Sequence, residues 1–257
     1  MPTKNTTVKR GAAKRRSPSA KAAEPAPERF TADGRKIVRL ERLKAHQKYI
    51  LKDGTQVVGA STIAKLGDDQ SNLIHWAWNL GNKNEDYRKV RDRAADIGTI
   101  THFLIECFFH GWVADLSEFA PADIEKAGVA FNNFLSFWNE QGLTVLEPEV
   151  QLVSEQHLFG GTIDAPSIDK EGRIVLLDWK TSSGIYLSQK LQLAAYERLW
   201  NENRPEQRVQ RRAVVRIGKE KANDHSIEWM FSSDNEWELF EARLNLHYAS
   251  LRYKKAA

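Results

Sequence analysis

The fold of this 257-residue chain is decided by the stretch from Gly161 to Tyr196, which reads GTIDAPSIDKEGRIVLLDWKTSSGIYLSQKLQLAAY. Two apolar-rich runs flank the turn-forming residues DKEGR, and this pattern predicts a β-hairpin. Asp164 precedes the turn, whereas Asp178 and Lys180 follow it on a run that predicts a buried strand. The two aspartates are therefore expected to lie side by side across the hairpin.

Two adjacent carboxylates repel each other and are costly to keep ionised unless a cation lies between them. Ligation by oxygen atoms, with room for water, suits Mg²⁺ or Mn²⁺. Lys180 would then face the ion and an anionic substrate, a combination that points to phosphodiester cleavage. A structural ion pair between Asp178 and Lys180 is the simplest alternative, since 28% of the chain is charged and an Asp-x-Lys tripeptide alone is weak evidence.

The composition limits the kind of protein. The single cysteine, Cys107, excludes an intramolecular disulfide and a four-cysteine iron–sulfur cluster. The chain has no run of eighteen apolar residues and no secretory signal at its N-terminus, so we expect a cytoplasmic protein without a membrane span. It also lacks the motif GxxxxGK[ST], so no ATP-driven motor is expected.

The charge is unevenly distributed along the chain. Seven basic residues and no acidic ones lie in the first 23 positions. The net charge of the whole chain is +4, so the remaining residues together carry a charge of about −3. This segment, with few large apolar residues, is expected to be disordered. It would serve either as a phosphate-binding arm for DNA or as a simple solvated tail.

Patterning divides the chain into three parts. Residues 1–29 form the basic tail, residues 30–142 are mainly helical, and residues 143–257 form an α/β core with a C-terminal helix. A small hairpin is expected from residue 46 onward, with an Asp53-Gly54 turn. Strands are expected at 143–153, 158–168, 174–179, 209–217 and 226–231, and helices at 70–80, 85–109, 121–142, 187–203 and from 233 onward.

Five short motifs, in this order, are similar to those of the PD-(D/E)XK nuclease superfamily, in particular its RecB-like exonuclease branch. Gly161-Thr162-Ile163-Asp164 resembles the GxxD motif, and Asp178-Trp179-Lys180-Thr181 resembles the DxK motif. Gln192-Leu193-Ala194-Ala195-Tyr196 resembles the QxxxY motif, and Gly98-Thr99-Ile100-Thr101-His102 resembles the helix that carries a metal-binding histidine. Glu149 precedes the GxxD motif, where many members have an acidic residue. The resemblance implies a restriction-endonuclease-like core with a central mixed β-sheet flanked by helices.

The resemblance also implies roles for individual residues. Asp164, Asp178 and the backbone carbonyl of Trp179 would bind the metal, with His102 as a further ligand and Glu149 acting through water. Lys180 would orient the attacking water and neutralise charge on the phosphate. Without the resemblance, a histidine on an apolar helix such as His102 is more commonly a packed residue.

Five other residues have weaker assignments. Glu106 lies one helical turn after His102 and would orient it, or simply pair with a neighbouring cation. Gln192 and Tyr196 share one helix face that points toward the site or toward DNA. Thr181 and Ser182 can donate hydrogen bonds to phosphate, although hydroxyl residues are also common in loops.

The function expected from the resemblance is a Mg²⁺- or Mn²⁺-dependent DNA exonuclease without an iron–sulfur cluster or ATP. It would act on ends or single strands in the recombination, repair or processing of phage or bacterial DNA, with a single-strand-annealing or single-strand-binding protein as a possible partner. A structure-specific endonuclease with the same site is the nearest alternative. The other is a non-catalytic DNA-binding assembly factor, although intact Asp164, Asp178 and Lys180 argue against it.

Overall fold

The computed structural model describes residues 28–41 and 48–256. The predicted basic tail lies outside the described residues apart from its last two positions. Six helices are present in the described part: α1 (Ala60–Ala64), α2 (Ser71–Asn82), α3 (Tyr87–His110), α4 (Pro121–Gln141), α5 (Leu187–Asn203) and α6 (Asp234–Ala256). None of these is long and apolar enough to cross a membrane.

A mixed five-stranded sheet forms the centre of the molecule, in the order β12-β11-β10-β9-β6. Its strands are β6 (Thr144–Val145), β9 (Ala165–Ile168), β10 (Ile174–Lys180), β11 (Val209–Ile217) and β12 (His225–Met230). Strand β10 runs antiparallel to β9 and parallel to β11. Helix α5 connects β10 to β11, because two parallel strands need a long crossover connection between them.

Two smaller sheets flank this centre. A four-stranded sheet has the order β3-β4-β8-β7, and a three-stranded sheet has the order β1-β2-β5. The first contains the predicted Asp53-Gly54 hairpin, whose second strand pairs in parallel with β8. The strands are β1 (Arg29–Phe30), β2 (Lys36–Arg39), β3 (Tyr49–Ile50), β4 (Gln56–Gly59), β5 (Val113–Asp115), β7 (Val150–Ser154) and β8 (Phe159–Ile163).

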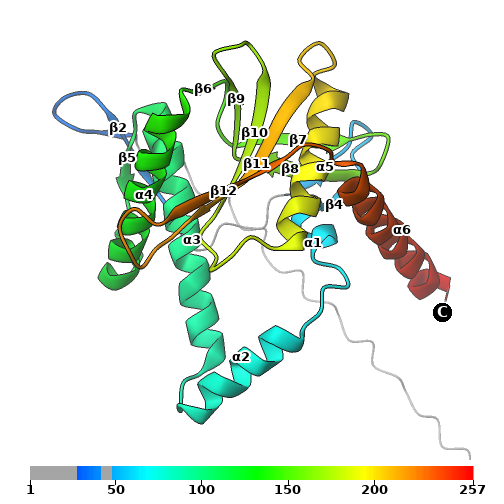
Figure 1. The fold of residues 1–257 in the computed structure, drawn as a ribbon, viewed down its shortest axis with the longest axis horizontal. Helices are drawn as coiled ribbons and strands as arrows, with labels where there is room; N and C mark the ends of the chain where they lie inside the picture. The colour runs from blue at the N-terminus through cyan, green and yellow to red at the C-terminus, as the bar shows by residue number, and fades with distance from the viewer. Residues whose placement is uncertain (1–27, 42–47, 257) are drawn as a thin grey trace, which may run out of the picture.

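Helices cover both faces of the central sheet (Figure 1). Alternate residues of β10 point to opposite faces, as the pleat requires. Leu176 packs in the cluster that contains α1, α5 and α6 residues, whereas Leu177 and Trp179 pack with Phe134 of α4 and other residues of α3 and α4. The expected architecture, a central mixed sheet flanked by helices, is confirmed.

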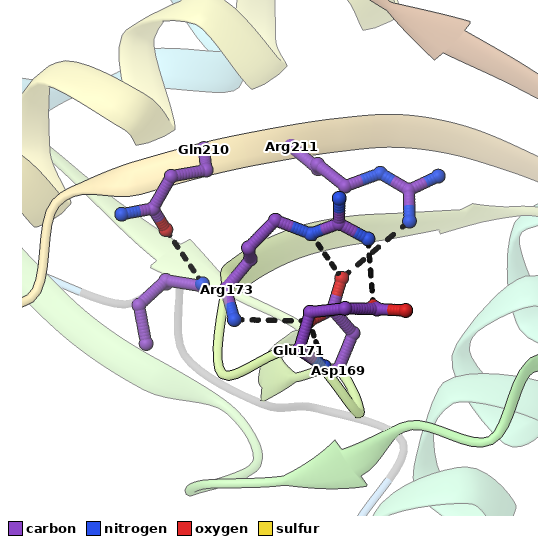
Figure 2. A network of polar contacts seen from close by, with 6 residues as sticks. Asp169, Glu171, Arg173, Gln210 and Arg211 are labelled. Atoms are coloured by element: carbon purple, nitrogen blue, oxygen red, sulfur yellow. Dashed lines mark hydrogen bonds and ion pairs between the residues drawn. The ribbon is translucent and has the colours of Figure 1, made fainter.

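The β9–β10 hairpin is fixed by polar contacts at its turn (Figure 2). The Asp169 carboxylate accepts hydrogen bonds from the backbone N–H groups of Glu171 and Arg173, at 3.1 and 2.9 Å, and from Arg173 Nε at 2.7 Å. Arg211 approaches the same carboxylate from β11 at 3.5 Å. Gly172 supplies the left-handed backbone of the turn, with φ of 78°. The predicted hairpin is therefore present with a single register.

Two strands predicted as continuous are each divided in the structure. The expected strand at 143–153 becomes β6 and β7, because Glu149 between them has a left-handed backbone with φ of 54°. The expected strand at 158–168 becomes β8 and β9, and Asp164 lies at the junction where the chain passes from the four-stranded to the five-stranded sheet. Both interruptions fall on candidate site residues. Apolar patterning cannot locate the break at Asp164 because Ile163 and Ala165 on either side of it are both buried, whereas the residues just before Glu149 are exposed or half-buried.

Gly161 allows α5 to approach β8 closely. A Cβ atom at this position would lie 2.6 Å from Tyr196 Cε1 and 3.0 Å from Leu199 Cδ1. We therefore expect Gly161→Ala to lower the free energy of unfolding by about 1–3 kcal/mol, because the buried helix must shift. Urea denaturation measures this change.

Gly128→Ala provides the matched control, because Gly128 lies inside α4 and, apart from its own stretch of helix, no described residue places an atom within 4 Å of an added Cβ. This substitution should leave the protein unchanged or stabilise it by up to about 1 kcal/mol. Equal destabilisation by the two substitutions would show that the contact between α5 and β8 is not the cause.

Candidate metal and catalytic site

Three side chains from separate elements converge at one end of the central sheet. His102 of α3, Glu149 from the segment before β7 and Asp164 from the β8–β9 junction each place a ligand atom within 4.8 Å of the other two. His102 Nδ1 lies 3.6 Å from Asp164 Oδ1. Its Nε2 lies 3.1 Å from the carbonyl oxygen of Trp179, the carbonyl predicted as a ligand.

Glu149 is held in its position by an unusual backbone conformation. Its φ of 54° lies in the left-handed region, which is uncommon for a residue other than glycine. The Glu149 N–H donates a hydrogen bond of 2.9 Å to the carbonyl oxygen of Asp164. The two acids are thus joined through the backbone, and local strain of this kind is concentrated at functional sites.

Asp164 and Asp178 are neighbours across the hairpin, as predicted. Strand β9 pairs Ala165 with Leu177, and the same register continued by one residue places Asp164 opposite Asp178. The Trp179 N–H donates a hydrogen bond of 2.8 Å to Asp164 Oδ2. One oxygen of Asp164 is therefore occupied by the backbone, and the other faces His102.

Asp178 is completely buried and forms an ion pair with Lys180, with Nζ 2.6 Å from Oδ2. Its Oδ1 atom has no hydrogen-bond partner within the described part of the chain. A buried carboxylate oxygen without a partner is costly, and a bound cation would satisfy it. Asp178 is not one of the three residues whose ligand atoms converge, so the structure associates it more closely with Lys180 than with His102.

Burial and mutual charge shift the pKa values of these groups. Burial raises the pKa of Asp178 to about 6, against the opposing influence of the Lys180 ammonium. Burial also opposes ionisation of Asp164, but the charge and hydrogen bond of His102, together with the charge of Lys180 and the hydrogen bond from the Trp179 N–H, outweigh it and lower the pKa of that carboxyl. Burial disfavours the imidazolium form of His102, yet the charge and hydrogen bond of Asp164 and the charge of Glu149 together raise its pKa to about 9. Without a metal, a proton on His102 thus compensates part of the acidic charge.

These residues fit a divalent cation. Two carboxylates and an imidazole converge, Asp178 Oδ1 has no hydrogen-bond partner among the described residues, and the cluster is acidic enough to retain a proton at neutral pH. Carboxylate and carbonyl oxygens suit Mg²⁺ and Mn²⁺, while an imidazole also suits transition metals.

A cavity of about 760 Å³ adjoins the cluster. His102, Glu149 and Lys180 line it, together with Thr181 and Ser182. Glu106 also lines it, one helical turn beyond His102, but does not belong to the converging group. The cavity thus gives a substrate access to His102, Glu149 and Lys180 and to two of the four predicted DNA-binding residues, whereas Asp164 and Asp178 lie behind its lining.

Gln192 and Tyr196 do not line this cavity. Tyr196 is buried, with 4% of its surface exposed, and its ring lies against the position of Gly161. Gln192 donates a hydrogen bond to the Tyr196 hydroxyl. In this structure the pair supports the strand that leads to Asp164, rather than presenting a surface to DNA.

Lys219 lines the site cavity and was not among the predicted residues. It follows Gly218 directly after β11, the strand parallel to β10. The carboxyl ends of parallel strands meet at the same edge of a sheet, so the end of β11 had to lie beside Lys180 and Thr181. Predicting the parallel pairing would have identified Lys219 from the sequence.

Comparison with known proteins assigns the chain to a family. The family model described as the PD-(D/E)XK nuclease superfamily matches residues 83–256, more than half of the chain. A search among curated proteins finds no match.

Solved structures show distant likeness. SSO0001 is 17% identical, with a TM-score of 0.32, over 49% of this chain and 62% of its own, so the chain spans less than two thirds of that protein. A "Putative exonuclease" from Eubacterium rectale is 14% identical, with a TM-score of 0.40, over 62% of this chain and 68% of its own.

In the metal-free protein, His102 is expected to titrate near pH 9. Asp164→Asn should lower that pKa, because it removes the charge that favours the imidazolium most. Nitrogen-15 NMR of the imidazole measures both values. A wild-type pKa at or below the ordinary 6.5 would contradict the geometry of the cluster.

The raised pKa of His102 also predicts how stability depends on pH. The folded-state value of about 9 exceeds the ordinary 6.5, so the stabilisation is complete below pH 6.5 and is lost as the pH rises through 9. The urea midpoint of the protein in chelator should fall across this window. His102→Gln should remove this part of the dependence, and an unchanged profile in that variant would refute the assignment.

Proposed function

The chain belongs to the PD-(D/E)XK nuclease superfamily, and from this premise we propose that it is a divalent-metal-dependent deoxyribonuclease that acts as an exonuclease. The observation that carries the proposal is the convergence of His102, Glu149 and Asp164 beside the buried Asp178–Lys180 pair. PD-(D/E)XK nucleases use divalent metals, and a protein without catalytic activity would have little reason to gather a lysine and three acids at one end of the central sheet.

In the proposed mechanism, His102, Glu149, Asp164 and the Trp179 carbonyl would hold Mg²⁺ or Mn²⁺, with Asp178 as a further ligand. The bound ion would supply Lewis-acid polarisation of the phosphate and activation of water. Lys180 orients the nucleophile and neutralises charge that develops on the phosphoryl oxygens. Its ammonium is kept protonated because, although burial opposes this, the charges of Asp178 and Asp164 raise its pKa.

Thr181 and Ser182 extend the site beyond the end of β10, where their hydroxyl groups would contact the substrate backbone. Ser182 Oγ accepts from Gln189 Nε2 and donates its single proton to the Gly184 carbonyl oxygen, so it would have to turn from Gly184 to donate to a phosphate oxygen. Glu106, one helical turn after His102 on α3, would orient the imidazole directly or through a water molecule.

An endonuclease is the second candidate, favoured by one observation. The site cavity shares four lining residues with a neighbouring cavity, so that a strand running through both would be accessible to internal cleavage. The sequence supports three further parts of the proposal. The protein would take part in phage or bacterial recombination, it would work with an annealing or single-strand-binding protein, and its basic N-terminal segment would contact phosphates.

Lys180→Ala and Asp164→Asn should each lower cleavage of end-labelled DNA by at least about 100-fold, because each removes a group that stabilises the transition state. EDTA should abolish cleavage, and added Mg²⁺ or Mn²⁺ should restore it. Lys170→Ala, at the exposed hairpin turn, is the matched control and should leave the rate unchanged. If the wild type leaves every DNA substrate intact with either metal, the non-catalytic assembly factor replaces this proposal.

Closed circular single-stranded DNA should resist the enzyme under conditions that degrade the linear form completely, since an exonuclease needs an end. The two substrates are compared by gel electrophoresis at equal nucleotide concentration. Cutting of the circle at a similar rate would establish the endonuclease instead.

A further inference from the structure

A second cavity of about 780 Å³ continues from the catalytic one. The two share the lining residues Ala94, Thr181, Ser182 and Lys219. The second cavity is bounded on one side by α2 and α3 and on the other by the segment after β11. Helix α2 itself projects away from the central sheet (Figure 1). A substrate bound at Lys180 therefore has a direct continuation along Thr181 and Ser182 into this cavity.

Three of the cations that line the second cavity are already paired with acids. Arg93 contacts Asp123 at 3.0 Å, Lys126 contacts Glu220 at 2.7 Å, and Arg216 forms an ion pair with Asp224. Such pairs leave little positive charge for a ligand. They also fix the walls of the cavity.

Lys219 differs from these three cations. It is half-buried, and within residues 28–41 and 48–256 no carboxylate forms an ion pair with it. Burial lowers the pKa of its ammonium, so its charge is held at some cost. An ammonium in this state, at the boundary between two cavities, is suited to an anion supplied by a ligand. A phosphate one or two positions from the reacting one would meet this requirement.

The second cavity also contains an aromatic side chain. Trp76 of α2 lines this cavity and is half-buried. Its ring packs edge-on against the Tyr87 ring, with 6.5 Å between the two ring centroids. Trp78, two residues further on, is 62% exposed and does not line the cavity. A cation and an aromatic ring lining one cavity form a combination that binds single strands, where the ammonium contacts the backbone and the ring stacks on an unpaired base.

We propose that the second cavity holds the single-stranded nucleic acid next to the scissile bond, with Lys219 on a backbone phosphate and Trp76 against a base. The inference rests on the proposed nuclease function and specifies its substrate as an unpaired strand. Bases in a duplex are already stacked on their neighbours and would not present a face to Trp76.

Binding of a fluorescein-labelled oligothymidylate to the full chain tests the aromatic contact. Anisotropy is measured in chelator, so that no cleavage occurs. Trp76→Ala should weaken binding about fivefold or more, as loss of one stacked base does. Trp78→Ala, on the same helix, should change it by less than about twofold, and Trp76→Phe should retain most of the affinity because it keeps a ring.

The salt dependence of the same binding tests the phosphate contact. Lys219→Gln should reduce the slope of log Kd against log salt concentration by about 0.7, the value for one phosphate contact on a single strand. Lys170→Gln should leave the slope unchanged, since this exposed lysine lies at the hairpin turn. Oligouridylate and a blunt duplex serve as further ligands. If a variant loses affinity for oligothymidylate alone, the strand bound is DNA, and if it also loses affinity for oligouridylate, the site accepts RNA as well. An equal loss of affinity for the blunt duplex would overturn the single-strand assignment.

The inference and the proposed function fail in different ways. If the wild type cleaves DNA but Trp76→Ala binds as tightly as Trp78→Ala and Lys219→Gln keeps the full salt slope, the second cavity is not the strand site. If binding changes as expected but no metal supports cleavage, the strand site stands and the nuclease proposal falls. Urea midpoints near that of the wild type establish that the variants are folded.

Discussion

The site depends on the placement of two carboxylates on adjacent strands inside the protein. Asp164 and Asp178 face each other across the β9–β10 pairing, and neither could remain ionised there without compensation. His102 supplies it for Asp164, and Lys180 supplies it for Asp178. Compensation of the Asp164 charge constrains the position of α3, because this helix must approach the sheet edge closely enough to bring His102 to Asp164. Gly98 permits the approach: a Cβ there would lie only 3.2 Å from Thr181 Oγ1.

Much of the fold could be predicted from the sequence because its signals are local. The DKEGR turn and the helix-ending residues Gly111 and Gly142 act within a few positions of themselves, and both glycines adopt the left-handed conformation that ends a helix. The order of strands is not local. Strand β4 pairs in parallel with β8, and β2 pairs in parallel with β5, although Val58 and Phe159, and Ile37 and Val113, lie far apart in the chain. No pattern in these segments identifies them as partners.

The site was predictable to the extent that its residues belong to motifs. The resemblance identified His102 and Glu149, which no periodicity would have selected, and the structure brings both to Asp164. It did not indicate that Tyr196 would be buried against β8, because a motif gives identity and order but no exposure. Lys219 belongs to none of the five motifs, and its importance arises only from the adjacency of β10 and β11.

The register of the β9–β10 hairpin limits how this part of the chain can change during evolution. Side chains alternate between the two faces of a strand, so one extra residue between Asp164 and Ile168, or between Ile174 and Asp178, would send one acid to the wrong face. Lengthening the loop between Asp169 and Arg173 would remove turn contacts but would leave both acids on their faces. Related sequences should therefore differ more in the length of this tip than in the count of residues from each acid to the paired end of its strand.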